Sequence, residues 1–204
     1  MLFFARKPKT EEITRKMVHI LGVLLIPAMH VFGKLNTAAF CALASIFLIF
    51  YPLAQERLEH RLVRHVTRRV NGLINFMERK AEKKLLIRYA GAVYFFLASA
   101  AVIFIFPIGI ASVSIAVLSL GDGFAALVGG LWGKHKFSFH KNRSWEGSLA
   151  FFAASLAGTM YLTNPVAAIM ASLVGALVEI LPVGIDDNVS VPIAVALFLK
   201  LYGL

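Results

Sequence analysis

Seven long apolar runs constrain this chain more than any other feature of its sequence. They cover roughly residues 17–32, 37–54, 88–106, 108–131, 147–163, 165–181 and 190–204. A helix that rises about 1.5 Å per residue needs about 20 such residues to cross a hydrocarbon core of about 30 Å. Hydrophobic residues make up 59% of the chain and charged residues 16%, against about 45–50% and 25% in soluble domains. We therefore expect an all-α integral membrane protein, a single domain over 1–204 with about seven transmembrane helices.

Lysine and arginine residues lie almost entirely in alternate connections between these runs. Of the 21, five precede residue 17, ten lie within 55–88 and four lie within 132–146. Basic residues that flank membrane helices stay on the cytoplasmic side, so this distribution predicts a cytoplasmic N-terminus and an external C-terminus. The formal charge of +10 then follows from topology. We expect membrane lipids, and not nucleic acid, as partners of these basic segments.

The connection 55–88 has apolar residues at intervals of three and four among its basic residues. This pattern predicts a cytoplasmic helical insertion of two amphipathic helices, which either lie on an anionic headgroup surface or extend the adjoining spans as a hairpin. A solvated basic face that fixes topology and attracts lipid headgroups is the simpler interpretation.

Asp122 is the clearest polar residue within an apolar run. A carboxylate near the centre of a span costs about 2.5–3.5 kcal/mol on insertion scales, so it usually faces a cavity or a partner and marks function. Gly121 and Gly123 flank it and would leave the backbone accessible. The alternative is a structural aspartate that pairs with a neighbouring helix.

A segment rich in glycine, cationic and hydroxyl residues comes after this span. Its candidate nucleotide-binding residues are Gly129, Gly133, Lys134, Lys141, Arg143, Ser144, Glu146, Gly147 and Ser148. The basic side chains and the N–H groups of a helix that begins near Gly147 would together form an anion site, for which a nucleoside triphosphate is a fitting occupant. Gly129 and Gly133 equally fit the small-residue spacing that lets membrane helices approach closely. The segment does not fit the phosphate-binding pattern GxxxxGK[ST].

Acidic residues gather at the end of the sixth run. Glu179, Asp186, Asp187 and Asn188 lie within ten residues of a chain that has only 11 acidic residues. Their oxygens suit Mg²⁺, which is commonly held by one or two carboxylates and the phosphates of a substrate. An acidic turn that caps a helix is the alternative.

Near the N-terminus, Arg15, Lys16 and His19 occupy the cytoplasmic turn of the first run. The predicted topology places this turn, Asp122, the 134–148 segment and the acidic turn on one membrane face. This face would then offer cations that bind phosphates, carboxylates that bind magnesium and an apolar bundle that binds a lipid. The combination favours a lipid-modifying phosphotransferase.

At these residues the sequence resembles the polyprenol kinase family of CTP-using membrane enzymes, which includes dolichol, phytol and CTP-dependent diacylglycerol kinases. The resemblance runs from Arg15-Lys16-x-x-His19 and Gly121-Asp122-x-x-Ala125-Ala126-x-x-Gly129 through Gly133-Lys134 to Ser144-x-Glu146-Gly147-Ser148, and then to Glu179 and Asp186-Asp187-Asn188. Arg143 stands where the family usually has lysine, which keeps the charge but changes its geometry.

The resemblance implies transfer of the terminal phosphoryl group of CTP to a lipid hydroxyl, with Arg15, Lys16, Asp122 and Gly129 at positions important for activity. In our mechanistic hypothesis Asp122 and the 179–188 carboxylates hold Mg²⁺, and Arg15, Lys16 and Arg143 offset charge on the transferring group. His19 or a carboxylate orients or deprotonates the alcohol. We expect a dolichol- or polyprenol-like alcohol and a prokaryotic plasma membrane with the site facing the cytoplasm.

Other functions remain open from the sequence. The same face could serve a cytidylyltransferase that forms a CDP-lipid, a diacylglycerol kinase, an ion-coupled transporter that uses Asp122 and Glu179, or a membrane scaffold. The lipid, the general base and the oligomeric state, including a homo-oligomer, are not determined by the sequence.

Overall fold

A computed structural model describes residues 19–57, 90–140, 142–182 and 184–203, and within these ranges the secondary structure is almost entirely helical. The expected all-α fold is confirmed. The described elements are the first helix His19–Val31, which contains η1 (Gly22–Leu24) and α2 (Leu25–Val31), then α3 (Lys34–Arg57), α5 (Ala90–Ile105), α6 (Ile108–Ala116), η2 (Val117–Asp122), α7 (Gly123–Trp132), α8 (Trp145–Thr159), α9 (Pro165–Ile180) and α10 (Asp187–Tyr202).

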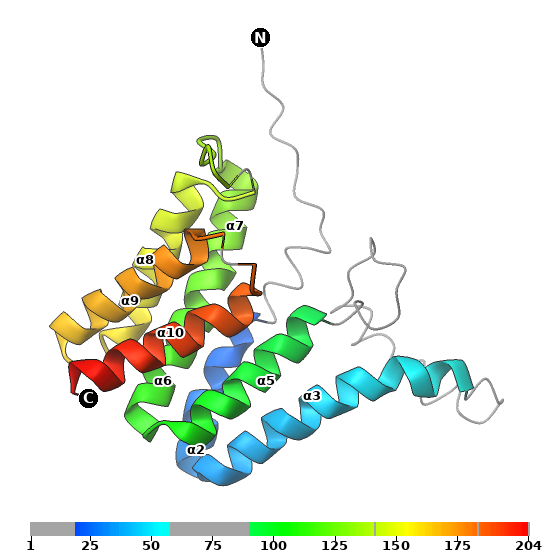
Figure 1. Cartoon of the computed structure of the whole chain (residues 1–204). Coiled ribbons are helices and arrows are strands. Elements are labelled where there is room, and N and C mark those ends of the chain that lie inside the picture. The colour runs from blue at the N-terminus through cyan, green and yellow to red at the C-terminus, as the bar shows by residue number, and fades with distance from the viewer. Residues whose placement is uncertain (1–18, 58–89, 141, 183, 204) are drawn as a thin grey trace.

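Each apolar run predicted from the sequence coincides with one of these helical segments (Figure 1). Among the described helices, two are long and apolar enough to cross a membrane, Lys34–Tyr51 and Ile108–Trp132, and three shorter ones are also apolar. Seven spans, the orientation and the number of crossings therefore stay predictions. Most of the 55–88 connection lies outside the described residues.

Local sequence signals begin and end several helices. Pro165 occupies the first turn of α9, where its missing N–H costs nothing, and the side chain of Asn164 accepts a hydrogen bond from the Ala167 N–H at 2.9 Å. Gly33, with φ +86°, closes the turn between α2 and α3, and Gly203, with φ +94°, ends α10. Both have the left-handed conformation that glycine adopts without strain.

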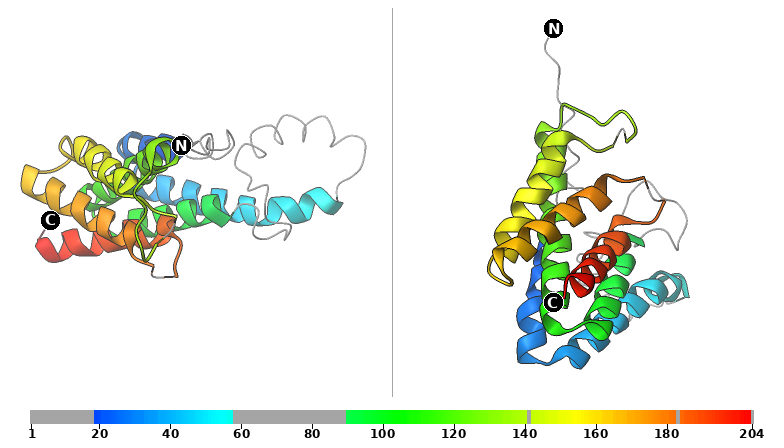
Figure 2. Two further views of the ribbon diagram at one scale, coloured as in Figure 1. Left: turned by 90° about the horizontal axis from the view of Figure 1, so that it is seen from above. Right: turned by 60° about the vertical axis from the view of Figure 1, so that its left-hand side comes forward.

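The segment α6–η2–α7 forms the centre of the bundle. Its residues from Ile110 to Leu118 are almost all buried, and it contacts the first helix, α5, α8, α9 and α10. Figure 2 shows α3 beside α5 on one side of the bundle, with α8 and α9 on the other side of this central rod. The central position brings η2 within reach of side chains from most of the other elements.

Phe151 of α8 fixes how α8 and α9 pack on η2. Its side chain is fully buried, and its ring fits between Gly121 and Gly175. A Cβ atom at Gly121 would lie 2.6 Å from the ring, and one at Gly175 would lie 3.0 Å from it. Gly121 thus makes room for a neighbouring aromatic ring, and does not expose the backbone as the sequence had led us to expect.

Candidate functional site

The helices place most of the predicted site residues at one end of the bundle. The first helix, α5, α8 and α10 begin at this end, and α7 and α9 finish there. We call it the charged end, and define it by Asp122, Arg143, Ser148, Glu179 and Asp187. Arg15, Lys16 and Lys141 lie outside the described residues, so their predicted roles stay predictions.

Arg143 is the centre of the charged end. Its two terminal nitrogens pair with different carboxylates, Nη1 with Glu179 of α9 and Nη2 with Asp187 of α10. The Arg143 and Glu179 side chains are 18% and 1% exposed. Burial by itself lowers the pKa of Arg143, but the charges of Glu179, Asp187 and Asp122 outweigh it, so that the pKa is raised above its ordinary value. Arg143 is therefore charged at any ordinary pH.

Asp122 enters this cluster from a stretch of π-helix. The residues Val117–Asp122 of η2 form a π-helical turn between two α-helical segments, and Asp122 is 1% exposed. A π-helical turn adds a residue to the helix and rotates the side chains beyond it, and such turns often occur at functional sites. The charge of Asp122 acts on Arg143. The structural alternative, an aspartate that interacts with a neighbouring element, therefore agrees with the structure, while the functional role of Asp122 stays a prediction.

Glu179 also receives a contact from α8. The Ser148 hydroxyl donates to Glu179 Oε2 over 3.5 Å, and both residues are buried. The cluster thus joins residues of η2, the α7–α8 connection, α8, α9 and α10. Ser148 was predicted as a nucleotide-binding residue from its sequence neighbours, whereas its proximity to Glu179 could not be read from them.

Asp186 and Asn188 have different roles in the acidic turn. Asp186 caps α10, where its Oδ1 accepts from the Asn188 backbone N–H at 3.0 Å and from the Asn188 side chain at 2.6 Å. The Asn188 side-chain oxygen is buried without a hydrogen-bond partner among the described residues. The acidic turn is therefore both a helix cap, through Asp186, and a contributor to the charged end, through Asp187.

The glycine-rich segment packs two helices together. Gly129 of α7 faces Gly147 of α8 so closely that a Cβ at Gly129 would lie 3.4 Å from the Gly147 Cα atom. Ser144 sits in the same contact and caps α8 by accepting from the Gly147 N–H at 3.2 Å. A side chain at Gly133 would overlap the Gly129 carbonyl and the Ser144 hydroxyl. The small residues thus serve helix packing, one of the two roles that their spacing predicted.

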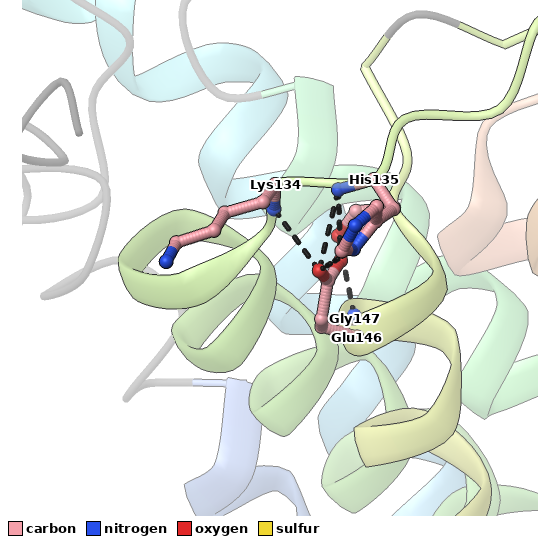
Figure 3. Close-up of polar contacts among 5 residues, drawn as sticks. Lys134, His135, Glu146 and Gly147 are labelled. Atoms are coloured by element: carbon pink, nitrogen blue, oxygen red, sulfur yellow. Dashed lines mark hydrogen bonds and ion pairs between the residues drawn. The ribbon is translucent and has the colours of Figure 1, made fainter. Parts of the chain in front are cut away.

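Glu146 ties the α7–α8 connection to the start of α8 (Figure 3). Its carboxylate accepts from the backbone N–H groups of Lys134 and His135 at 3.2 Å, and contacts His135 Nδ1 at 2.7 Å. Its own backbone N–H, then the His135 side chain and the neighbouring N–H groups, lower the pKa of Glu146 to about 2, and these hydrogen bonds outweigh the opposing effect of burial. Glu146 therefore holds the connection that carries Arg143.

The start of α8 differs from the anion site that we expected from its N–H groups. The helix begins at Trp145, two residues before the expected start. The Trp145 N–H donates to the His135 carbonyl at 3.0 Å and the Gly147 N–H donates to Ser144. Because these two N–H groups already donate hydrogen bonds within the protein, we expect side chains, and not these N–H groups, to bind a phosphate.

The donor set at the charged end suits a hard divalent cation. Asp122, Glu179 and Asp187 carry carboxylate oxygens, which are ligands that Mg²⁺ prefers. Asn188 was predicted with them, but its side-chain amide donates to Asp186, and no contact among the described residues places its oxygen beside these carboxylates. Within the part of the chain that the structure describes, no three His, Cys, Asp or Glu side chains already converge as a metal site. A cation would therefore be completed by oxygens of its ligand, as is usual for Mg²⁺ with phosphates.

Comparison with known proteins shows relatives over nearly the whole chain. A probable chloroplastic phytol kinase of Triticum aestivum is 31% identical over 94% of this chain and 68% of its own length. The chain belongs to the polyprenol kinase family. A probable chloroplastic phytol kinase of Oryza sativa is 30% identical over 95% of the chain and 65% of its own length. The CTP-dependent diacylglycerol kinase 1 of Schizosaccharomyces pombe is 29% identical over 66% of the chain and 69% of its own length.

The chain thus spans about two thirds of the length of these kinases. No family model matches the sequence, and no solved structure matches it. The chloroplast relatives do not support the prokaryotic origin that we expected, while the two long apolar helices agree with membrane association.

Proposed function

We propose that this protein is a CTP-dependent lipid kinase, which transfers the γ-phosphoryl group of CTP to the hydroxyl of an isoprenoid alcohol at the charged end of the bundle. The observation that carries the proposal is Arg143, held between Glu179 and Asp187 beside Asp122 inside an otherwise apolar helical bundle. Buried acidic and basic groups in membrane helices are costly and usually mark function. Relatives named as phytol and diacylglycerol kinases support phosphoryl transfer to a lipid.

The charged end offers both of the charges that phosphoryl transfer needs. One or two of the carboxylates Asp122, Glu179 and Asp187 would hold a magnesium ion together with phosphate oxygens, and the ion would neutralise charge on the triphosphate. Arg143 presents a fixed fork of donors that matches phosphate oxygens. Its carboxylate partners keep the guanidinium oriented before a nucleotide arrives, so little reorientation is required when phosphate oxygens replace one of them.

The reaction itself exchanges one phosphorus–oxygen bond for another. The alcohol oxygen bonds to the γ-phosphorus, the bond from that phosphorus to the bridging oxygen of CDP breaks, and the hydroxyl proton passes to a base. His19 and Asp122 are the candidates for this base. His19 lies at the beginning of the first helix, which packs against η2 through η1, and the residue is buried.

Labelled CTP tests the proposal directly. The purified protein is incubated with Mg²⁺, a panel of lipid alcohols and lipid phosphates, and CTP carrying label on the α or the γ phosphate, and the lipids are then extracted. We expect label in the lipid phase only from the γ position. Label from the α position would indicate a CDP-lipid synthase, and no transfer from either position would contradict an enzyme acting on these lipids.

The alcohol that becomes labelled identifies the substrate. Phytol kinase relatives favour phytol or a similar short isoprenoid over the dolichol-length alcohol that the sequence led us to expect. A panel that includes dolichol, phytol and diacylglycerol separates these three possibilities, and replacing CTP by ATP tests the nucleotide preference.

A further inference from the structure

An apolar groove runs along the first helix, outside the charged end. It has a volume of about 580 Å³ and lies between this helix, the beginning of α3 and α5. Its lining includes His19, Gly22, Ala28, Phe32, Phe40 and Phe95. The size lies within the range of about 300–1,000 Å³ that is typical of small-molecule sites.

The wall of the groove is apolar along its length, with polar groups at its two ends. At the far end Asn36 and Thr37 use their side-chain donors on backbone carbonyls, at 2.8 Å to Phe32 and 3.0 Å to Gly33. The polar group at the near end is His19, whose ring packs edge-on against Phe95 with 5.1 Å between ring centres. A ligand would therefore have a long apolar part and one polar head, and the head would lie near His19.

The near end of the groove adjoins the charged end. Gly22 lies against Ser119 of η2, because a Cβ at Gly22 would be 2.6 Å from the Ser119 hydroxyl. The first helix and the central rod run in opposite directions, since η1 contacts η2 whereas α2 contacts the preceding α6. His19, one turn before Gly22, thus lies at about the level of Asp122, one turn after Ser119.

The groove also opens sideways. Leu21, Leu24, Phe32 and Phe40 line it and are each more than half exposed. In a bilayer these side chains would face acyl chains, so a lipid could enter from the membrane without crossing water. From His19 to Phe32 the groove extends about 20 Å at a helical rise of about 1.5 Å per residue, which is less than the hydrocarbon core of about 30 Å.

We propose that this groove binds the isoprenoid tail of the lipid alcohol and sets its preferred length, with the hydroxyl at His19 beside the charged end. This inference rests on the proposed function. A single elongated groove accepts one chain, which favours a diterpenoid alcohol over a two-chained diacylglycerol, and a dolichol tail would extend far beyond Phe32.

Shortening the groove tests whether it determines the preferred length of the isoprenoid chain. Ala28 lines it about 14 Å along the helix from His19, at a rise of about 1.5 Å per residue. In Ala28→Phe we expect kcat/KM for phytol and geranylgeraniol to fall about tenfold or more, the scale of specificity that apolar pockets achieve. Geraniol, whose chain ends before Ala28, should be phosphorylated as in the wild type. Ala39→Phe, at an exposed alanine of α3 that does not line the groove, is the control.

Widening the far end is a second variant that leaves the packed core intact, because Phe32 is 67% exposed. Phe32→Ala should shift the preference toward longer prenols. The proposal would be overturned by an unchanged ratio of phytol to geraniol turnover in Ala28→Phe together with an unchanged ratio of longer prenols to phytol in Phe32→Ala.

A cross-linking experiment tests the groove independently of turnover. The full-length protein in nanodiscs is irradiated with farnesol that carries a benzophenone at its hydrocarbon end, with and without excess phytol. We expect cross-links at Phe32–Phe40 that phytol suppresses. Cross-links spread over all exposed helices would indicate bulk lipid in the groove and would overturn the proposal. Suppressible cross-links without any phosphoryl transfer would retain the groove as a prenol site and refute the kinase function.

Discussion

Replacing Arg143 by methionine should lower the free energy of unfolding. Among the basic residues that the structure describes, we expect the loss of this side chain to be the most destabilising. The substitution keeps a similar length of apolar side chain but removes the cation that faces Glu179 and Asp187. Glu179 is 1% exposed, so its charge would remain in the bundle without this guanidinium.

The magnitude depends on the burial of the two partners. Removing one member of a buried ion pair costs about 3–5 kcal/mol, which applies to Glu179. Asp187 is 29% exposed, and a pair of that kind contributes about 1 kcal/mol or less. The two losses together amount to about 3–6 kcal/mol. For a chain of this size 1 kcal/mol corresponds to about 2–4 °C, so Arg143→Met should lower the unfolding temperature by roughly 6–24 °C.

Thermal unfolding in detergent, followed by near-ultraviolet circular dichroism, measures the effect. The double variant Arg143→Met, Glu179→Gln should regain part of the loss, because it no longer buries an uncompensated carboxylate. Lys136→Met, at an exposed lysine of the same connection, is the control and should change the unfolding free energy by less than about 0.5 kcal/mol. The reasoning would be refuted if Arg143→Met behaved like this control, or if removing Glu179 simply added a second loss.

Three further predictions concern other parts of the molecule. Asp122→Asn should reduce phosphoryl transfer by about 100-fold or more, the scale of losing one preorganised electrostatic group, while gel filtration shows a folded protein; full activity would exclude Asp122 from the reaction. Glu146 has an ordinary pKa of 4.5 that is lowered to about 2 in the fold, so its contribution to stability is present above about pH 4.5 and is lost as the pH falls toward 2. The unfolding temperatures of wild type and Glu146→Gln should accordingly differ at pH 6 and converge near pH 2, and a constant difference would contradict this origin. Gly121→Ala should lower the free energy of unfolding by about 1–3 kcal/mol, because the new Cβ overlaps the Phe151 ring. Gly109→Ala, whose Cβ would meet nothing within 4 Å, is the control and should not destabilise the protein. Equal unfolding temperatures of the two variants in thermal melts would show that the Phe151 contact relaxes freely.

The candidate site was predictable to the extent that residue type reveals it. Asp122 was identified because a carboxylate in an apolar run is costly, and Glu179 because it belongs to a cluster of oxygen ligands at the end of the sixth run. Both are buried at the charged end. Ser144 and Gly147 were predicted as ligands of a nucleotide, which stays a prediction, and in the structure they cap α8 and pack it against α7. The sequence contained both possibilities, since small and hydroxyl residues serve helix caps as well as phosphates.

Other features had no signal in the sequence. The π-helical turn that places Asp122 depends on how η2 packs, because the same residues would also propagate an α-helix. The pairing of Arg143 with Asp187 joins residues 44 positions apart, and no local pattern determines such a distance. The groove beside the first helix combines three segments that are each simply apolar when read alone.

The sequence by itself determined the helices, because long apolar runs have few other ways to satisfy their backbone groups in a membrane. It also determined helix ends such as Asn164 and Asp186, where a side chain caps the backbone beside it. Only the tertiary structure decided which faces of these helices meet. The runs are apolar on most sides, so hydrophobicity alone does not orient them. Small residues and the shapes of the side chains orient the helices, as the Phe151 ring between Gly121 and Gly175 illustrates. This packing brings Arg143 to the carboxylates of Glu179 and Asp187.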